Sequence, residues 1–365
     1  MDKNFLKTIL NRLSKMGCHE ADVFFSKSKT SSCSSRLGKI EKKEESSTSE
    51  IGIRAIINKK QSIVSTTNLE KQNVYNLTEK VVEMAKVVPE NQYCGLAESD
   101  KIKQVSKQEV QKLEICDTYE PTMSLIEKEV IKLEESALDN KEITNSEGAE
   151  IAYSKNSICL LGSNGLEIEM EKTHSDFIIA VLAGSKDSME REYDYKSKVF
   201  YNELGDFEKI GKEVSQNAIK KLNSRKLKTC KSDVIFDSKV SSSLLRNLFS
   251  ASNAQSIVKG ISFLKDKMNN KIFNDQISII DDPLMPKKLR SKISDCEGIQ
   301  SKKKFLIEKG YLKFFFNSLA SAKQIKHEPS GHATRSASSI PSVSYSNLYM
   351  ENGEVSKLDM IKSLK

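Results

Sequence analysis

The chain has 365 residues, of which 38% are hydrophobic and 30% are charged, and its formal net charge is +8. This length predicts about two globular domains, and the apolar fraction is sufficient for each domain to bury a core. With only six Pro and no Trp, the composition excludes a Pro-rich linker protein. The positive charges are scattered and do not alternate with aromatic residues, so we do not expect nucleic acid as a partner.

The N-terminal residues and the cysteines indicate in which cellular compartment the protein lies. Charged and polar residues interrupt the apolar positions of the N-terminus, which argues against a cleavable signal peptide. We also expect no membrane span, because no window holds 18 uncharged apolar residues. The seven cysteines are scattered without any Cys-x-x-Cys spacing, which argues against a disulfide framework and a zinc knuckle. Reduced thiols of this kind indicate a cytoplasmic protein.

Apolar residues at helical spacing predict an amphipathic helix over residues 5–16, which Gly17 ends. Four strands are expected next, the last two joined by a polar turn as a hairpin. These strands are 22–26, 31–37, 50–57 and 62–66. Thr67 and Glu70 have the spacing of a capping box, and Pro89 ends the helix that the box would open.

A second long helix is expected to begin near Pro121, after which the apolar period changes to two. This period predicts a meander of antiparallel strands, over 149–153, 157–161, 166–173, 177–183 and 192–200. Asn164-Gly165 is the strongest turn signal among them, because both residues tolerate the positive φ of a tight hairpin. A helix over 207–222 would close the first domain.

The remaining chain is expected to form a helix over 240–254 and several strands, at 233–236, 276–280, 304–307 and 311–317. The order of elements predicts an α+β class with two domains. In the first, residues 1–224, N-terminal helices pack on a largely antiparallel sheet. The second, residues 225–365, is expected to be β-rich.

Turns rich in Gly, Asp and Asn mark the C-terminal half of the chain. They are Asp295-Cys-Glu-Gly298, Pro329-Ser-Gly-His-Ala-Thr-Arg335 and Asn347-Leu-Tyr-Met-Glu-Asn-Gly353. Glu50-Ile-Gly-Ile-Arg54 and Asp233-Val-Ile-Phe-Asp237 precede them. Taken in this order, the motifs resemble the TldD/PmbA family, historically called modulators of DNA gyrase, and in particular its PmbA/TldE-like branch.

The resemblance implies a two-domain fold, assembly with a TldD-like catalytic subunit, and a cytoplasmic role in degrading or processing unstructured peptides. Members of the family continue for several tens of residues past the position that matches Lys365. We therefore expect the C-terminal domain to be incomplete, without its last strands.

The resemblance also locates the family's zinc motif. In the catalytic subunits, His-Glu-x-x-x-His lies on one helix, where two imidazoles bind zinc and the Glu polarises water. The matching helix here, residues 244–254, contains no His, Cys or Glu. We therefore expect no metal and no cofactor in this chain, and zinc in a TldD-like partner. His327-Glu-Pro-Ser-Gly-His332 has the same letters, but Pro329 and Gly331 would break a helix, so we interpret this match as a coincidence.

Five residues are candidates for the wall of a substrate cleft: Asp295, Glu297, Gly331, His332 and Arg335. Asp295 and Glu297 could pair as acid and base or cap a turn that shapes the wall. Arg335 could hold a peptide carboxylate or form a structural salt bridge. No catalytic residue is expected.

Two other functions stay open at this point. One is a self-sufficient metallopeptidase that uses His327, Glu328 and His332. The other is a gyrase-modulating or nucleic-acid-binding protein, which the family's older name and the positive charge would suit.

Overall fold

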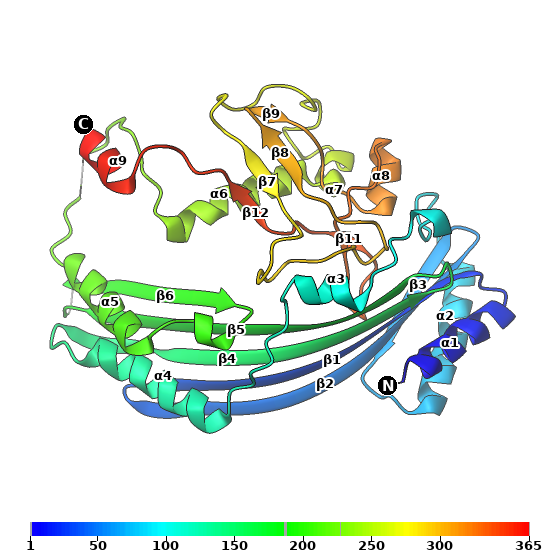
Figure 1. The fold of residues 1–365 in the computed structure, drawn as a ribbon, viewed down its shortest axis with the longest axis horizontal. Coiled ribbons are helices and arrows are strands. Elements are labelled where there is room, and N and C mark those ends of the chain that lie inside the picture. The colour runs from blue at the N-terminus through cyan, green and yellow to red at the C-terminus, as the bar shows by residue number, and fades with distance from the viewer. Residues whose placement is uncertain (1, 186–187, 227, 365) are drawn as a thin grey trace.

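A computed structural model describes residues 2–185, 188–226 and 228–364. Its largest element is a curved antiparallel sheet with strand order β3-β2-β1-β4-β5-β6 (Figure 1). The strands are β1 (Glu20–Arg36), β2 (Lys39–Ile57), β3 (Lys60–Thr66), β4 (Ile143–Gly162), β5 (Glu167–Ala183) and β6 (Glu190–Lys198). Neighbouring residues of a strand point to opposite faces, so each strand contributes to two separate layers of packing.

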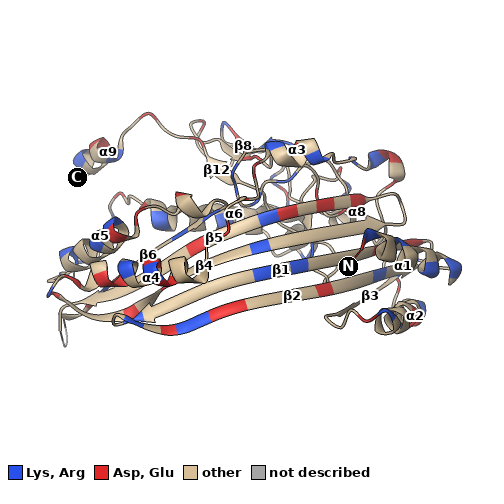
Figure 2. Cartoon of the chain, turned by 60° about the horizontal axis from the view of Figure 1, so that its bottom comes forward, with Lys and Arg blue, Asp and Glu red and all other residues tan. Residues whose placement is uncertain are grey.

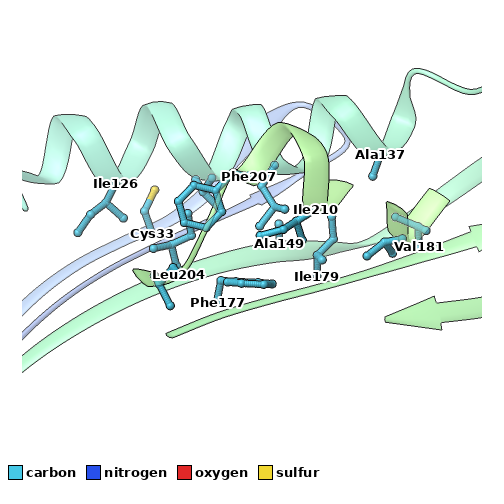
Figure 3. Packing of buried hydrophobic residues seen from close by; sticks show 14 of the residues in the cluster. Cys33, Ile126, Ala137, Ala149, Phe177, Ile179, Val181, Leu204, Phe207 and Ile210 are labelled. Carbon is cyan, nitrogen blue, oxygen red and sulfur yellow. The ribbon is translucent and has the colours of Figure 1, made fainter. Parts of the chain in front are cut away.

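Helices cover the convex face of this sheet at its two ends (Figure 1). They are α1 (Lys3–Lys15) and α2 (Lys71–Val87) at one end, and α4 (Met123–Leu138) and α5 (Phe207–Lys220) at the other. Phe207 of α5 meets Phe177 of β5 edge to face, with ring centroids 5.7 Å apart (Figure 3). The amphipathic pattern of each helix is therefore satisfied by the sheet, as the helical spacing predicts.

The C-terminal part of the chain lies over the concave face (Figure 1). Its described residues form a four-stranded sheet, a two-stranded pair and four helices. The strands are β7 (Ile279–Asp281), β8 (Lys304–Glu308), β9 (Tyr311–Leu312), β10 (Ala333–Thr334), β11 (Ser342–Val343) and β12 (Leu348–Met350). The helices are α6 (Ser238–Ser252), α7 (Ala254–Val258), α8 (Leu319–Ile325) and α9 (Lys357–Ser363). Leu306 and Phe316 are fully buried in the core of this part.

The two parts share an apolar contact on the concave face. Phe24 and Leu160 from the long sheet pack with Leu319 and Ala337 from the C-terminal part. Gly52 of β2 permits this contact, since a Cβ atom there would lie 1.8 Å from the carbonyl oxygen of Ala337. The glycine in the motif over 50–54 is thus required by a close approach of two backbones.

The α+β class and the antiparallel sheet are confirmed, with local corrections. The predicted pairs of short strands are single long strands, because half-buried polar residues continue the ladder through their middles. The predicted strand over 233–236 is irregular, and Val234 is 70% exposed. The predicted strand over 311–317 is only β9, which ends at Leu312, because the aromatic residues after it leave the sheet and pack into the core. The capping box is wrong: α2 starts after Glu70 without a side-chain cap, and Asn68 instead accepts the Glu70 N–H at 3.1 Å.

The last helix that the structure describes is α9, and position 365 lies outside the described residues. None of the helices that the structure describes combines the length and the apolar character needed to cross a bilayer.

Candidate functional site

Asp295 connects two of the three C-terminal turns. Its Oδ1 accepts the N–H groups of Glu297 and Ile299 at 2.9 and 3.0 Å, and its Oδ2 accepts the N–H of Ala333 at 3.0 Å. Burial raises the pKa of Asp295 above its usual range. The interpretation of Asp295 as a turn cap is confirmed, because all three bonds hold backbone groups of the two turns.

Glu297 holds the start of α8. Its Oε2 accepts the N–H of Leu319 at 2.7 Å. Burial, and then the neighbouring charge of Asp295, raise the pKa of Glu297 to about 8, although the Leu319 N–H and Arg54 oppose the shift. The carboxyl group lines a cavity of about 160 Å³, together with Arg54, Asn91, Gln255 and Ser318 among others. Burial in this cavity therefore favours the protonated form of Glu297.

His332 is enclosed, and both of its ring nitrogens are engaged. Nε2 lies 2.9 Å from Oδ2 of Asp281, and Nδ1 lies 2.9 Å from Oγ of Ser330. The other Asp281 oxygen accepts the N–H of Ser346 at 2.7 Å, which ties this cluster to the segment before β12. Burial lowers the pKa of His332, so the ring is held neutral. This arrangement fixes His332 as a link between strands.

Gly331 precedes this histidine in a conformation that favours glycine. Its φ is +80°, and a Cβ atom would lie 2.7 Å from the carbonyl oxygen of Gln300. A side chain at this position would therefore push the turn away from its neighbour.

Arg335 joins the C-terminal part to the long sheet. Its Nη1 donates to Oδ1 of Asp22, while Nε of Arg54 donates to the other Asp22 oxygen at 2.7 Å. The three side chains are at most 5% exposed. Burial alone would raise the pKa of Asp22, but the two guanidinium groups outweigh it and lower that pKa. Of the two interpretations of Arg335, the structure shows the salt bridge.

The residues that resemble a zinc motif do not share a helix. α8 ends at Ile325, Lys326 turns into the left-handed region with φ 57°, and His327 follows outside the helix. His327 and Glu328 are exposed, whereas His332 is buried against Asp281 and Ser330. Among the described residues, no three or more His, Cys, Asp or Glu side chains gather as a metal site would require. These donors therefore do not fit zinc.

The helix that we expect to match the family's zinc helix also lacks donors. α6 consists of Ser, Leu, Val, Phe, Ala, Lys, Arg and Asn residues, and its apolar face packs Leu248 and Ala251 into the C-terminal core. Zinc prefers imidazole, thiolate and carboxylate ligands, and α6 carries none of these groups.

Sequence alone does not identify two of the residues that matter most as site residues. Asp22 and Arg54 are buried charges within apolar strand segments, and a charged residue in such a segment is the signal that was available. Their partners are too far away in the chain to be inferred, as the 313 residues between Asp22 and Arg335 illustrate. Of the five cleft candidates, the structure brings Glu297 to a cavity and gives the other four structural partners or neighbours. Substrate binding by any of them stays a prediction.

Family models and known relatives match this chain over most of its length. Models of PmbA/TldA metallopeptidase domain 1, the central domain and the C-terminal domain match residues 21–85, 110–222 and 229–365. A metalloprotease PmbA homolog of Buchnera aphidicola (Acyrthosiphon pisum) is 27% identical over 90% of this chain and 73% of its own length. The metalloprotease PmbA of Escherichia coli O157:H7 is 26% identical over 86% of this chain and 69% of its own length. For a second Buchnera homolog, from Baizongia pistaciae, the chain spans 61% of the relative's length.

Solved structures share the fold. A Bacteroides thetaiotaomicron protein assigned as a modulator of DNA gyrase superposes with a TM-score of 0.87 at 21% identity, covering 100% of this chain and 80% of its own. TldE from Thermococcus kodakarensis superposes with a TM-score of 0.83 at 20% identity, covering 99% and 80%. The three matched segments take up most of the 365 residues and follow one another in the order of the family's domains. The chain therefore belongs to the PmbA/TldD metallopeptidase family.

Proposed function

We propose that this chain is the zinc-free subunit of a heteromeric metallopeptidase that degrades or processes unstructured peptides in the cytoplasm. The observation that carries the proposal is the donor set of α6, which offers no His, Cys, Asp or Glu where the family's catalytic subunits bear their zinc ligands. A TldD-like subunit would supply the metal and the hydrolytic chemistry. This chain would contribute a wall of the reaction chamber and contacts to the peptide.

The internal contacts of His332 weigh against a self-sufficient metallopeptidase. To bind a metal through Nε2, the ring would have to release Oδ2 of Asp281 and leave that buried oxygen without its hydrogen bond, a loss of about 1–3 kcal/mol. To bind through Nδ1, it would have to give up its contact with Ser330. His327 lies beyond the end of α8 and stacks on Phe315 at 6.0 Å, so a second imidazole is not aimed at the first.

Nucleic-acid binding has less support. Lys and Arg are interspersed with Asp and Glu over the face shown in Figure 2, and many of the lysines are paired with carboxylates. A surface of mixed sign gives little of the counterion release that drives binding to phosphates.

Reconstitution tests the proposal. The chain, a TldD-like subunit and the co-expressed pair are each incubated with a fluorescence-quenched disordered peptide. We expect a stable complex and rapid cleavage by the pair, and no cleavage by the chain alone. The variant Glu328→Gln should behave as the parent does in all three mixtures. Cleavage by the isolated chain that Glu328→Gln abolishes would overturn the proposal.

A further inference from the structure

A segment of β5, in the long sheet, has a free edge. β6 pairs with β5 only from Ser175 to Ala183, and the N–H of Thr173 donates to the carbonyl of Ile115 at 3.1 Å. Antiparallel ladders alternate, so the backbone groups of Glu169 and Glu171 point the same way as those of Thr173, away from β4. In the part of the chain that the structure describes, no strand pairs with β5 there.

A groove runs along this edge. The short helix α3 (Lys107–Lys112) and the chain that follows it form the opposite wall. The cavity between them measures about 650 Å³, within the range of ordinary ligand sites. The residues that line it include Val110, Ile115, Glu169, Met170 and Glu171.

The chemistry of the lining differs on the two faces of β5. Met170 points to the concave face, where Val110 and Ile115 lie near it. Glu169 and Glu171 point to the convex face, where Lys3 and Lys155 contact them at 2.7 and 3.7 Å. These ion pairs are exposed enough to exchange for the lysines of a ligand. A strand added here would place alternate side chains among apolar groups and among carboxylates.

The outer edge of β6 is protected against such addition. The ammonium of Lys221 donates to the carbonyl of Arg191 at 3.0 Å, and that of Lys239 donates to the carbonyl of Tyr193 at 2.9 Å. Covering the polar groups of an edge strand in this way commonly prevents unwanted pairing. The free edge of β5 lacks this protection and is bordered by a groove instead.

We propose that the groove between β5 and α3 binds an extended peptide as an additional antiparallel strand, with basic residues alternating with apolar ones. Backbone hydrogen bonds to Glu169 and Glu171 would supply affinity for many sequences, and the carboxylates would favour lysine or arginine on one face. The inference rests on the proposed function in one respect, which is that the peptide is a substrate on its way to the catalytic subunit.

The test uses the full chain without any catalytic subunit. The probe is a fluorescein-labelled octapeptide that alternates lysine and valine, and its binding is followed by fluorescence anisotropy. We expect saturable binding, and slower amide hydrogen exchange in the segment 166–173 when the peptide is bound. A peptide that alternates glutamate and valine should bind more weakly, because its charge repels the groove.

N-methylation separates strand pairing from simple charge attraction. Lysines opposite Glu169 and Glu171 would direct their N–H groups to β5, so N-methylation of the lysines should weaken binding by about tenfold or more. N-methylation of the valines, whose N–H groups point away, should have little effect. Equal binding of the two N-methylated peptides, or unchanged exchange over 166–173, would overturn the proposal.

A protein variant gives an independent check. Glu171→Pro removes an N–H that points into the groove and leaves the ladder with β4 intact, whereas Glu171→Ala removes only the carboxylate. We expect the proline variant to bind the probe more weakly than the alanine variant, and equal affinities would count against strand addition. The binding test contains no catalytic subunit, so its failure would not contradict the proposed function. Conversely, if the chain binds the peptide but never forms an active pair with a catalytic subunit, only the proposed function is contradicted.

Discussion

Replacing Asp22 by Asn should destabilise the chain more than replacing either of its arginine partners. Asp22 is the carboxylate between two buried guanidinium groups, and its side chain is 3% exposed. Its loss would leave Arg54 and Arg335 as adjacent buried cations. Removal of one partner from a buried ion pair costs about 3–5 kcal/mol. If the chain unfolds as one unit, the entropy of unfolding expected for 365 residues makes this loss equivalent to a fall in Tm of about 4–7 °C.

Arg335→Met is the matched control for this prediction. It keeps an apolar stem over the ring of Phe24 and leaves the Asp22–Arg54 pair intact, so we expect a loss of only about 1–2 kcal/mol. Unfolding in urea and by heat is followed by circular dichroism, because the chain has no Trp. The reasoning is refuted if Arg335→Met costs as much as Asp22→Asn.

The carboxylate of Asp22 also makes the stability of the folded chain depend on pH. The folded pKa of Asp22 lies below the ordinary value of 3.8, so its stabilising contribution is complete above that pH and is lost as the pH falls through the folded pKa. Asp22→Asn should therefore lose its disadvantage relative to the parent in strong acid, and an undiminished difference there would contradict the assignment.

Three further changes test other parts of the structure. Glu297 has a pKa of about 8 against an ordinary 4.5, so its stabilising contribution is complete below pH 4.5 and is lost as the pH rises through 8. Glu297→Gln should therefore stabilise the chain at pH 9 by on the order of 5 kcal/mol, with little effect at pH 4, and a gain that is independent of pH would be contrary evidence. Gly52→Ala should lower the free energy of unfolding by about 1–3 kcal/mol and increase proteolysis of the segment 333–341, because Ala337 must move. An unchanged digestion pattern would argue against the close approach of the backbones at Gly52 and Ala337. Phe177→Ala should lower the free energy of unfolding by about 3–5 kcal/mol in denaturant melts, since its ring is 1% exposed against Phe207 (Figure 3), and a loss below about 1 kcal/mol would mean that this core is loosely packed.

Sequence reasoning worked best where one local signal determined the element. The apolar spacing of 5–16 gave α1, and Asn164-Gly165 gave the turn between β4 and β5. It failed where tertiary contacts override local preference. Polar residues over 154–156 suggested a break, yet they continue β4 because strands pair with them on both sides.

In the candidate site, too, local motifs predict single residues but not the contacts between distant segments. The turn residues Asp295 and Gly331 were recognisable from their motifs, and the structure gives them capping and positive-φ roles. The pairing of Asp22 with Arg335 and of Asp281 with His332 joins chain segments that are 313 and 51 residues apart. A single sequence does not show which residues pair over such separations. The free edge of β5 was equally invisible, because it depends on where β6 stops.

Zinc analysis of the purified full-length chain tests the central claim most directly. The chain is exposed to zinc, dialysed, and measured by mass spectrometry of the metal content, alone and as the complex with a TldD-like subunit. The donor-free α6 and the enclosed His332 predict zinc far below one ion per isolated chain, and one ion per complex carried by the partner. One tightly held zinc in the isolated chain, lost on His332→Ala or His327→Ala, would contradict the account.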